Sequence, residues 1–152
     1  MITTQPMNRW DRLLAFACVA TGCSGLFFVV AGGATEAIFN RMVFGSAPSP
    51  VVGSNARDYL KFVYRVLGAV MVGWTASLAP TVLGPLRRRE RWAWSQVAWS
   101  IGIWFSVDTA ASLASGFPEN ALLNVGFGLL FAIPLAGMRP TLVDAPIRAD
   151  PR

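Results

Sequence analysis

Residues 104–135, WFSVDTAASLASGFPENALLNVGFGLLFAIPL, contain two long apolar runs that are separated by a short polar turn. The turn, GFPEN at 116–120, combines glycine and proline, which interrupt helices. A helix of about 20 mostly apolar residues is long enough to cross a bilayer. The stretch therefore predicts two neighbouring membrane-spanning helices that are joined by a tight turn.

Two further apolar segments precede this pair and bring the prediction to four membrane spans. The predicted spans cover residues about 13–39, 59–83, 92–115 and 121–138. No alternation of apolar and polar residues of the kind found in membrane β-barrels is sustained along the chain. We therefore predict an all-α fold, an antiparallel four-helix transmembrane bundle in one domain over residues 1–140. The segment 141–152 is predicted to be a disordered cytoplasmic tail.

The composition fits a membrane protein better than a soluble one. Of 152 residues, 54% are hydrophobic and only 14% are charged, which is too few charges to cover a soluble domain. The net charge of +5 could indicate a nucleic-acid partner, but the basic residues gather at the ends of the apolar runs, as the positive-inside rule expects. We therefore predict the lipid bilayer as the partner and no nucleic acid.

The basic residues also predict the orientation of the spans. One side of the predicted bundle holds the termini and most of the basic residues: Arg9, Arg12, Arg87, Arg88, Arg89, Arg91 and Arg139. The other side holds Arg41, Arg57 and Lys61. Because the richer side faces the cytoplasm, we predict that both termini are cytoplasmic and that the protein lies in the inner (plasma) membrane.

The residue types do not favour metal or acid–base chemistry. The chain has no histidine, which is the commonest metal ligand and the usual general base. Cys18 and Cys23 lie five residues apart and form neither a CxxC motif nor a zinc spacing. We predict no cofactor and no metal, and no pairing of a nucleophile with a base indicates an enzyme.

Asp108 is the one charge inside the third predicted span, and Arg65 lies at a similar depth in the second. Asp108 precedes Gly116 by eight residues, which places it about 12 Å below the outer end of its span. Arg65 lies six residues into its span, about 9 Å below the same surface. Because a central charge that faces lipid costs at least about 2.5–3.5 kcal/mol, we predict that both side chains face the bundle interior and form an ion pair.

Other polar residues share this depth, so a buried polar cluster is predicted in the outer half of the bundle. Its members are Arg65, Asp108, Asn120, Asn124, Glu36, Tyr64 and Thr109. One interpretation is a structural latch, since polar contacts between membrane helices stabilise packing by about 0.6 kcal/mol each. The other is a pocket for a small ligand, a lipid headgroup or an ion, since charges within membranes are functional candidates.

Three runs of the sequence carry a resemblance to a known group of proteins. They are FVYRVLGAVMVGW (62–74), RRRERWAW (87–94) and the stretch at 104–135. Their Tyr-Arg-x-x-Gly, Arg-Trp-Ala-Trp and Trp-Phe-x-x-Asp-Thr motifs resemble those of a family of small bacterial four-helix integral membrane proteins with no assigned activity. The resemblance implies a four-span fold and carries over four positions: Arg65, Asp108, Asn120 and Asn124.

Two functions are favoured by these observations, and a membrane enzyme that acts on lipid or quinone is a third, less favoured alternative. We expect an integral membrane protein that acts as a small structural or accessory bundle. The alternative is a small-solute or proton-coupled transporter or binder that uses a pocket at Arg65 and Asp108. Assembly into a homo-oligomer or a larger membrane complex is a further alternative, because four helices alone enclose little volume.

Overall fold

The computed structural model describes residues 7–45 and 53–142 of the chain, and these residues form five α-helices. The helices are α1 (Arg9–Val30), α2 (Gly32–Phe44), α3 (Ser54–Leu83), α4 (Arg91–Ala114) and α5 (Pro118–Met138), followed by a 3₁₀ turn over Arg139–Thr141. Four of them, α1, α3, α4 and α5, are long and apolar enough to cross a membrane. The described part of the chain is therefore all-helical, and the protein is a multi-pass membrane protein.

The second, third and fourth predicted spans correspond to α3, α4 and α5, with ends that differ by a few residues. Proline suits the first turn of a helix, and α5 begins at Pro118. Gly116, in the turn before it, adopts a φ of +78°, which favours glycine. The predicted disordered tail, 141–152, lies almost wholly outside the described residues, which end at Leu142.

The first predicted span, 13–39, is two helices rather than one. α1 ends at Val30, Ala31 has the non-helical angles φ −109° and ψ 43°, and α2 begins at Gly32. Gly32 packs against α3, where a β-carbon on it would lie 3.6 Å from Nε of Arg65. The chain therefore changes direction against the surface of α3, and Glu36 belongs to α2 instead of to the first span.

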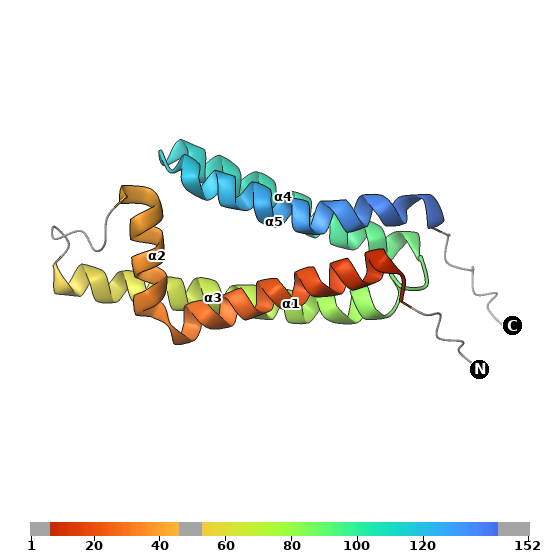
Figure 1. Cartoon of the computed structure of the whole chain (residues 1–152), viewed down its shortest axis with the longest axis horizontal. Coiled ribbons are helices and arrows are strands. Elements are labelled where there is room, and N and C mark those ends of the chain that lie inside the picture. The colour runs from red at the N-terminus through yellow and green to blue at the C-terminus, as the bar shows by residue number, and fades with distance from the viewer. Residues whose placement is uncertain (1–6, 46–52, 143–152) are drawn as a thin grey trace, which may run out of the picture.

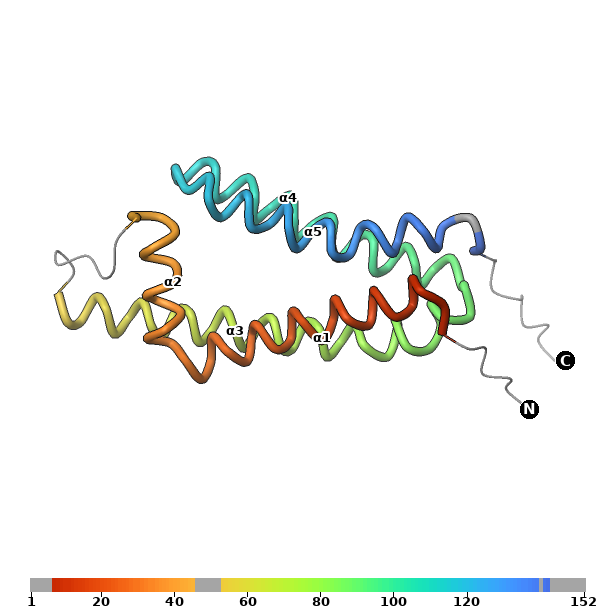
Figure 2. Tube along the Cα trace, in the orientation of Figure 1, coloured from red at the N-terminus to blue at the C-terminus, as the bar shows by residue number. Residues whose placement is uncertain are grey.

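The four long helices form two pairs. α1 packs along α3 and α4 packs along α5, and Figure 1 shows the pairs close together at one end and apart at the other, where α2 stands across the space. Figure 2 shows that the start of α1 and the end of α5 lie at the close end, together with the α3–α4 connection. We call the close end, with residues 84–90, the arginine end. The separated end, with the α4–α5 turn at residues 115–117, is called the cleft end.

The buried apolar core lies at the arginine end and joins the two pairs. Its members include Leu14, Val82, Leu86, Val97, Leu135 and Met138. Within the α4–α5 pair, Nε1 of Trp94 donates a hydrogen bond to the backbone carbonyl of Leu135 at 2.8 Å. Side-chain packing and hydrogen bonds of this kind hold helices together in lipid, because the hydrophobic effect does not drive their association there.

An ion pair closes the arginine end. The Asn8 side chain caps α1 by accepting hydrogen bonds from the backbone N–H groups of Trp10 and Asp11, and Asp11 accepts one from the N–H of Asn8. The guanidinium of Arg89 donates to both carboxylate oxygens of Asp11, at 2.8 and 3.1 Å. The Asp11 side chain is only 4% exposed and that of Arg89 is 16% exposed, so the carboxylate is buried and its partner largely so. The sequence indicated Arg89 only as part of a topology signal, and the pair was not predicted.

Candidate functional site

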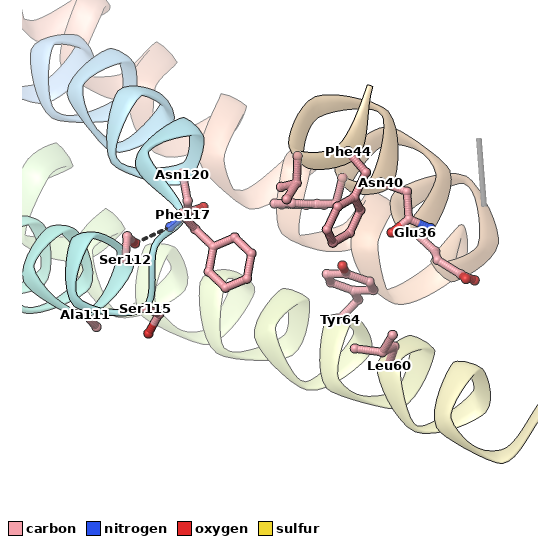
Figure 3. Close-up of a pocket in the computed structure, with 12 residues that line it drawn as sticks. Glu36, Asn40, Phe44, Leu60, Tyr64, Ala111, Ser112, Ser115, Phe117 and Asn120 are labelled. Atoms are coloured by element: carbon pink, nitrogen blue, oxygen red, sulfur yellow. Dashed lines mark hydrogen bonds between the residues drawn. The ribbon is translucent and has the colours of Figure 1, made fainter. Parts of the chain in front are cut away.

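A cleft of about 530 Å³ opens between the two helix pairs at the cleft end. Figure 3 shows Phe44 and Tyr64 on one wall and Phe117 on the other. Asn120 and Ser112 lie on the second wall, where the amide nitrogen of Asn120 donates to the Ser112 hydroxyl at 2.7 Å (Figure 3). The cleft thus combines aromatic surface with a few polar groups, as small-molecule sites usually do.

A second space, which we call the inner cavity, adjoins the cleft. It has a volume of about 320 Å³ and lies between α1, α3, α4 and α5. Phe39 and Asn120 line both spaces, so they lie at the junction of the cleft and the inner cavity. Trp74, Trp104 and Asp108 line the inner cavity. Asp108 therefore borders a cavity instead of being packed into a filled helix interface.

Neutral donors hold Asp108 in place. The amide nitrogen of Asn120 donates to Oδ1 of Asp108 at 3.3 Å. The Ser112 hydroxyl, one turn along α4, donates to the backbone carbonyl of Asp108 at 2.6 Å and stands 3.5 Å from Oδ1. These contacts orient the carboxyl group without supplying a positive charge.

A second bridge joins α4 and α5 one turn further along α5. Asn124 is 4% exposed, and its amide nitrogen donates to the hydroxyl of Thr109 at a long 3.4 Å. The α4–α5 pair therefore brings together four residues of the predicted cluster: Asp108, Thr109, Asn120 and Asn124. Ser112, which was not in the predicted cluster, joins them.

The structure does not form the predicted ion pair between Arg65 and Asp108. Arg65 is exposed on α3 with its Nε beside Gly32, and it takes part in none of the ion pairs among the described residues. The helix pairs diverge toward the cleft end (Figure 1), so two residues at equal depth on α3 and α4 are held apart. Arg65 instead faces the turn into α2.

Glu36 and Tyr64 belong to the opposite wall of the cleft. Glu36 is 7% exposed, and Nε of Arg57 stands 3.3 Å from its carboxylate. Tyr64 stacks on Phe39 of α2, with ring centroids 5.2 Å apart and an angle of 20° between the planes. The two acidic residues of the site therefore differ: Glu36 has an arginine partner, whereas Asp108 has no cationic partner in the described part of the chain.

Sequence reasoning missed the aromatic lining of the inner cavity. The ring of Trp74 lies 5.9 Å from that of Trp104 and 5.9 Å from that of Phe131. Thr21 of α1 also lines this cavity, and its buried hydroxyl has no hydrogen-bond partner among the described residues. Spacing alone does not find these residues, because aromatic side chains in a span occur on packed and on lipid-facing sides alike.

The site offers aromatic faces, hydrogen-bond acceptors and a carboxylate. Within residues 7–45 and 53–142, no group of three or more His, Cys, Asp or Glu side chains could hold a metal ion. The chemistry that these groups support is recognition of a small molecule by shape, hydrogen bonding and charge.

Comparisons of the chain with family models, curated proteins and solved structures found no match. The resemblance to small bacterial four-helix membrane proteins stays a prediction. The geometry of the cleft and the inner cavity therefore carries the functional argument.

Proposed function

We propose that this protein binds a small amphipathic molecule in the cleft and the inner cavity. The observation that carries the proposal is the pair of adjoining spaces, about 530 and 320 Å³, lined by aromatic side chains and bordered by the hydrogen-bonded carboxyl group of Asp108. An apolar space with a few convergent polar groups is typical of small-molecule sites. The apolar body of the ligand lies against the aromatic rings, and its polar end reaches Asp108 and Asn120.

We further propose that the protein lies in the inner (plasma) membrane as an antiparallel four-span bundle with both termini cytoplasmic. The arginine end carries Arg87, Arg88 and Arg89, and the positive-inside rule assigns such an end to the cytoplasm. The cleft end then faces outward, so a ligand enters from the outer leaflet or from the solution beyond it.

Binding is favoured over a purely structural role for the polar cluster. A latch requires a contact between elements that are not already neighbours in one helix pair, and at the arginine end Asp11 of α1 meets Arg89 of the loop that links the two pairs. The hydrogen bonds of Asp108 stay within the α4–α5 pair, at the end where the pairs diverge (Figure 1). The cluster therefore contributes little to holding the pairs together, and its groups border a cavity.

Filling the inner cavity tests the proposal. Leu67 of α3 lines the cavity and is 44% exposed, so Leu67→Trp adds bulk there without entering the core. Val66 is 45% exposed and is not among the residues that line the two spaces, which makes Val66→Trp a matched control. The probe is phenylbutanol, a neutral molecule with an aromatic body and one hydroxyl group.

Binding is measured by equilibrium dialysis against the full chain in phosphatidylcholine nanodiscs, corrected for uptake by empty nanodiscs. We expect saturable binding to the wild type and to Val66→Trp, and an affinity at least about tenfold lower for Leu67→Trp. Uptake that saturates in none of the three proteins would refute the proposal and return the structural or accessory bundle as the preferred function.

A further inference from the structure

Aromatic rings form much of the inner cavity's lining. Trp74 lies close to both Trp104 and Phe131, with centroid separations of 5.9 Å to each. Phe28 and Phe39, which also line the cavity, meet edge to face at 5.7 Å. The face of an aromatic ring carries partial negative charge, and the face of tryptophan attracts cations most strongly.

The polar groups of the inner cavity leave acceptors, more than donors, for a ligand. The amide nitrogen of Asn120 already donates twice, to Oδ1 of Asp108 and to Ser112. Asn124 donates to Thr109. What these residues offer to the cavity is therefore mainly the asparagine carbonyl oxygens and the carboxylate of Asp108.

Two residues that line the inner cavity, half-buried Asp108 and buried Thr21, have polar groups with few partners. Asp108 has no cationic partner within the described residues, and its side-chain contacts there are with neutral donors. Thr21 is 2% exposed, and its hydroxyl oxygen is buried with no hydrogen-bond partner in the same part of the chain. An ionisable side chain within a membrane-spanning helix is a candidate for a functional site.

We infer that the ligand of the inner cavity is a small organic cation, a protonated amine or a quaternary ammonium that carries an apolar group. Its charge lies beside Asp108 and against the face of Trp104, and its apolar group packs near Phe131. An anion is disfavoured by the carboxylate and by the aromatic faces alike. The inference rests on the proposed function, because it names the class of ligand for the same cavity.

A matched pair of ligands tests the inference. Benzyltrimethylammonium and neopentylbenzene have the same shape, because a carbon atom in the second takes the place of the charged nitrogen in the first. We expect the full chain in phosphatidylcholine nanodiscs to bind the cation at least about tenfold more tightly, after correction for uptake by empty nanodiscs.

Variants at the carboxylate assign the preference to Asp108. Asp108→Asn retains the shape of the side chain, and it should lower the affinity for benzyltrimethylammonium at least about tenfold while leaving that for neopentylbenzene unchanged. Asp58→Asn is the matched control, because the Asp58 side chain is 76% exposed near the start of α3 and is not among the residues that line the two spaces. It should change neither affinity.

A tryptophan variant gives an independent measurement if Asp108→Asn does not fold. Trp104→Leu should weaken binding of the cation more than binding of neopentylbenzene, because the loss of the indole face removes the cation–π contact. Trp99 is 71% exposed on the same helix and does not line the inner cavity, so Trp99→Leu should change neither affinity.

The outcomes separate this inference from the proposed function. Equal affinities of the wild type for the two ligands, or a cation affinity that survives Asp108→Asn, overturn the inference and leave the proposed binding of an amphipathic molecule standing. If neither ligand binds saturably while phenylbutanol does, the inference alone falls. If none of the three binds, the proposed function falls with it.

Discussion

At the arginine end, Asp11 takes two hydrogen bonds from the guanidinium of Arg89, a residue 78 positions away in the sequence. At the cleft end, the side chain of Asp108 meets only Ser112 and Asn120 among the described residues, 4 and 12 positions away. The first carboxylate ties α1 to the loop that follows α3. The second stays within the α4–α5 pair and borders a cavity.

The difference is what the proposed function expects, with stability supplied at one end and ligand binding at the other. The arginine end contains the buried ion pair and the apolar core, including Leu14, Leu86 and Met138. The cleft end contains the cleft, and the inner cavity adjoins it and reaches the core at Phe131. Proteins commonly break packing rules at functional sites and compensate elsewhere. Under the proposed function, stability supplied at one end lets the other end retain an incompletely packed site.

Breaking the pair at the arginine end should have the largest effect on stability. Arg89→Ala leaves the buried carboxylate of Asp11 without its cation, a change that lowers the free energy of unfolding by about 3–5 kcal/mol. Residue 89 has a φ of +62°. Alanine is strained there as arginine is, so the loss reports the ion pair and not the backbone. Titration of the micelle-bound protein with a denaturing detergent measures it.

The neighbouring arginine supplies the control for this prediction. Arg88 also pairs with a carboxylate, that of Glu90 at 2.6 Å, but its side chain is 58% exposed. Exposed ion pairs contribute at most about 1 kcal/mol, so Arg88→Ala should have a small effect. Equal losses for Arg88→Ala and Arg89→Ala would show that the Asp11–Arg89 pair does not close this end.

The cleft end should be far less sensitive to loss of charge. Asp108→Asn should change the free energy of unfolding by only about 0.6 kcal/mol, the average for a polar contact between membrane helices. Arg65→Ala should change it little, because Arg65 is exposed and makes no ion pair among the described residues. A double-mutant cycle on Arg65 and Asp108 should therefore give a coupling energy near zero.

The same cycle on Asp11 and Arg89 is the positive control. Residues in direct contact give coupling energies of about 0.5–3 kcal/mol. A comparable coupling between Arg65 and Asp108 would restore the latch interpretation of the polar cluster, and the contrast between the two ends would fail.

The sequence was sufficient for features that depend on length and on adjacency along the chain. The thickness of a bilayer sets the length of a span, so apolar runs locate α3, α4 and α5. The GFPEN turn is short, so α4 and α5 have few alternatives to packing together. For this reason Asp108 meets Asn120, and Thr109 meets Asn124.

The sequence alone could not predict features that depend on the rotation of a helix about its axis. Depth arithmetic places Arg65 and Asp108 at one level, but it does not say which way either side chain faces. The direction of Arg65 depends on the break at Ala31, which no proline marks and which brings α2 against α3. The partner of Arg89 likewise depends on the left-handed backbone conformation of Arg89 itself, in the loop between α3 and α4.

The smallest effect concerns the response of the arginine end to acid. Glu90 accepts hydrogen bonds from Nε of Arg88 and Nε1 of Trp92, both at 2.6 Å, and they lower the pKa of its carboxyl group below the ordinary value of 4.5. The folded state therefore favours the ionised form, and this contribution to stability is complete above pH 4.5 and disappears as the pH falls through the lowered pKa.

Glu90→Gln removes the contribution. The difference in the free energy of unfolding between the wild type and this variant should therefore shrink from about pH 6 to about pH 3. A constant difference would mean that the loop has no acid-sensitive contact, and the contrast with the cleft end would then depend on Asp11 and Arg89 alone.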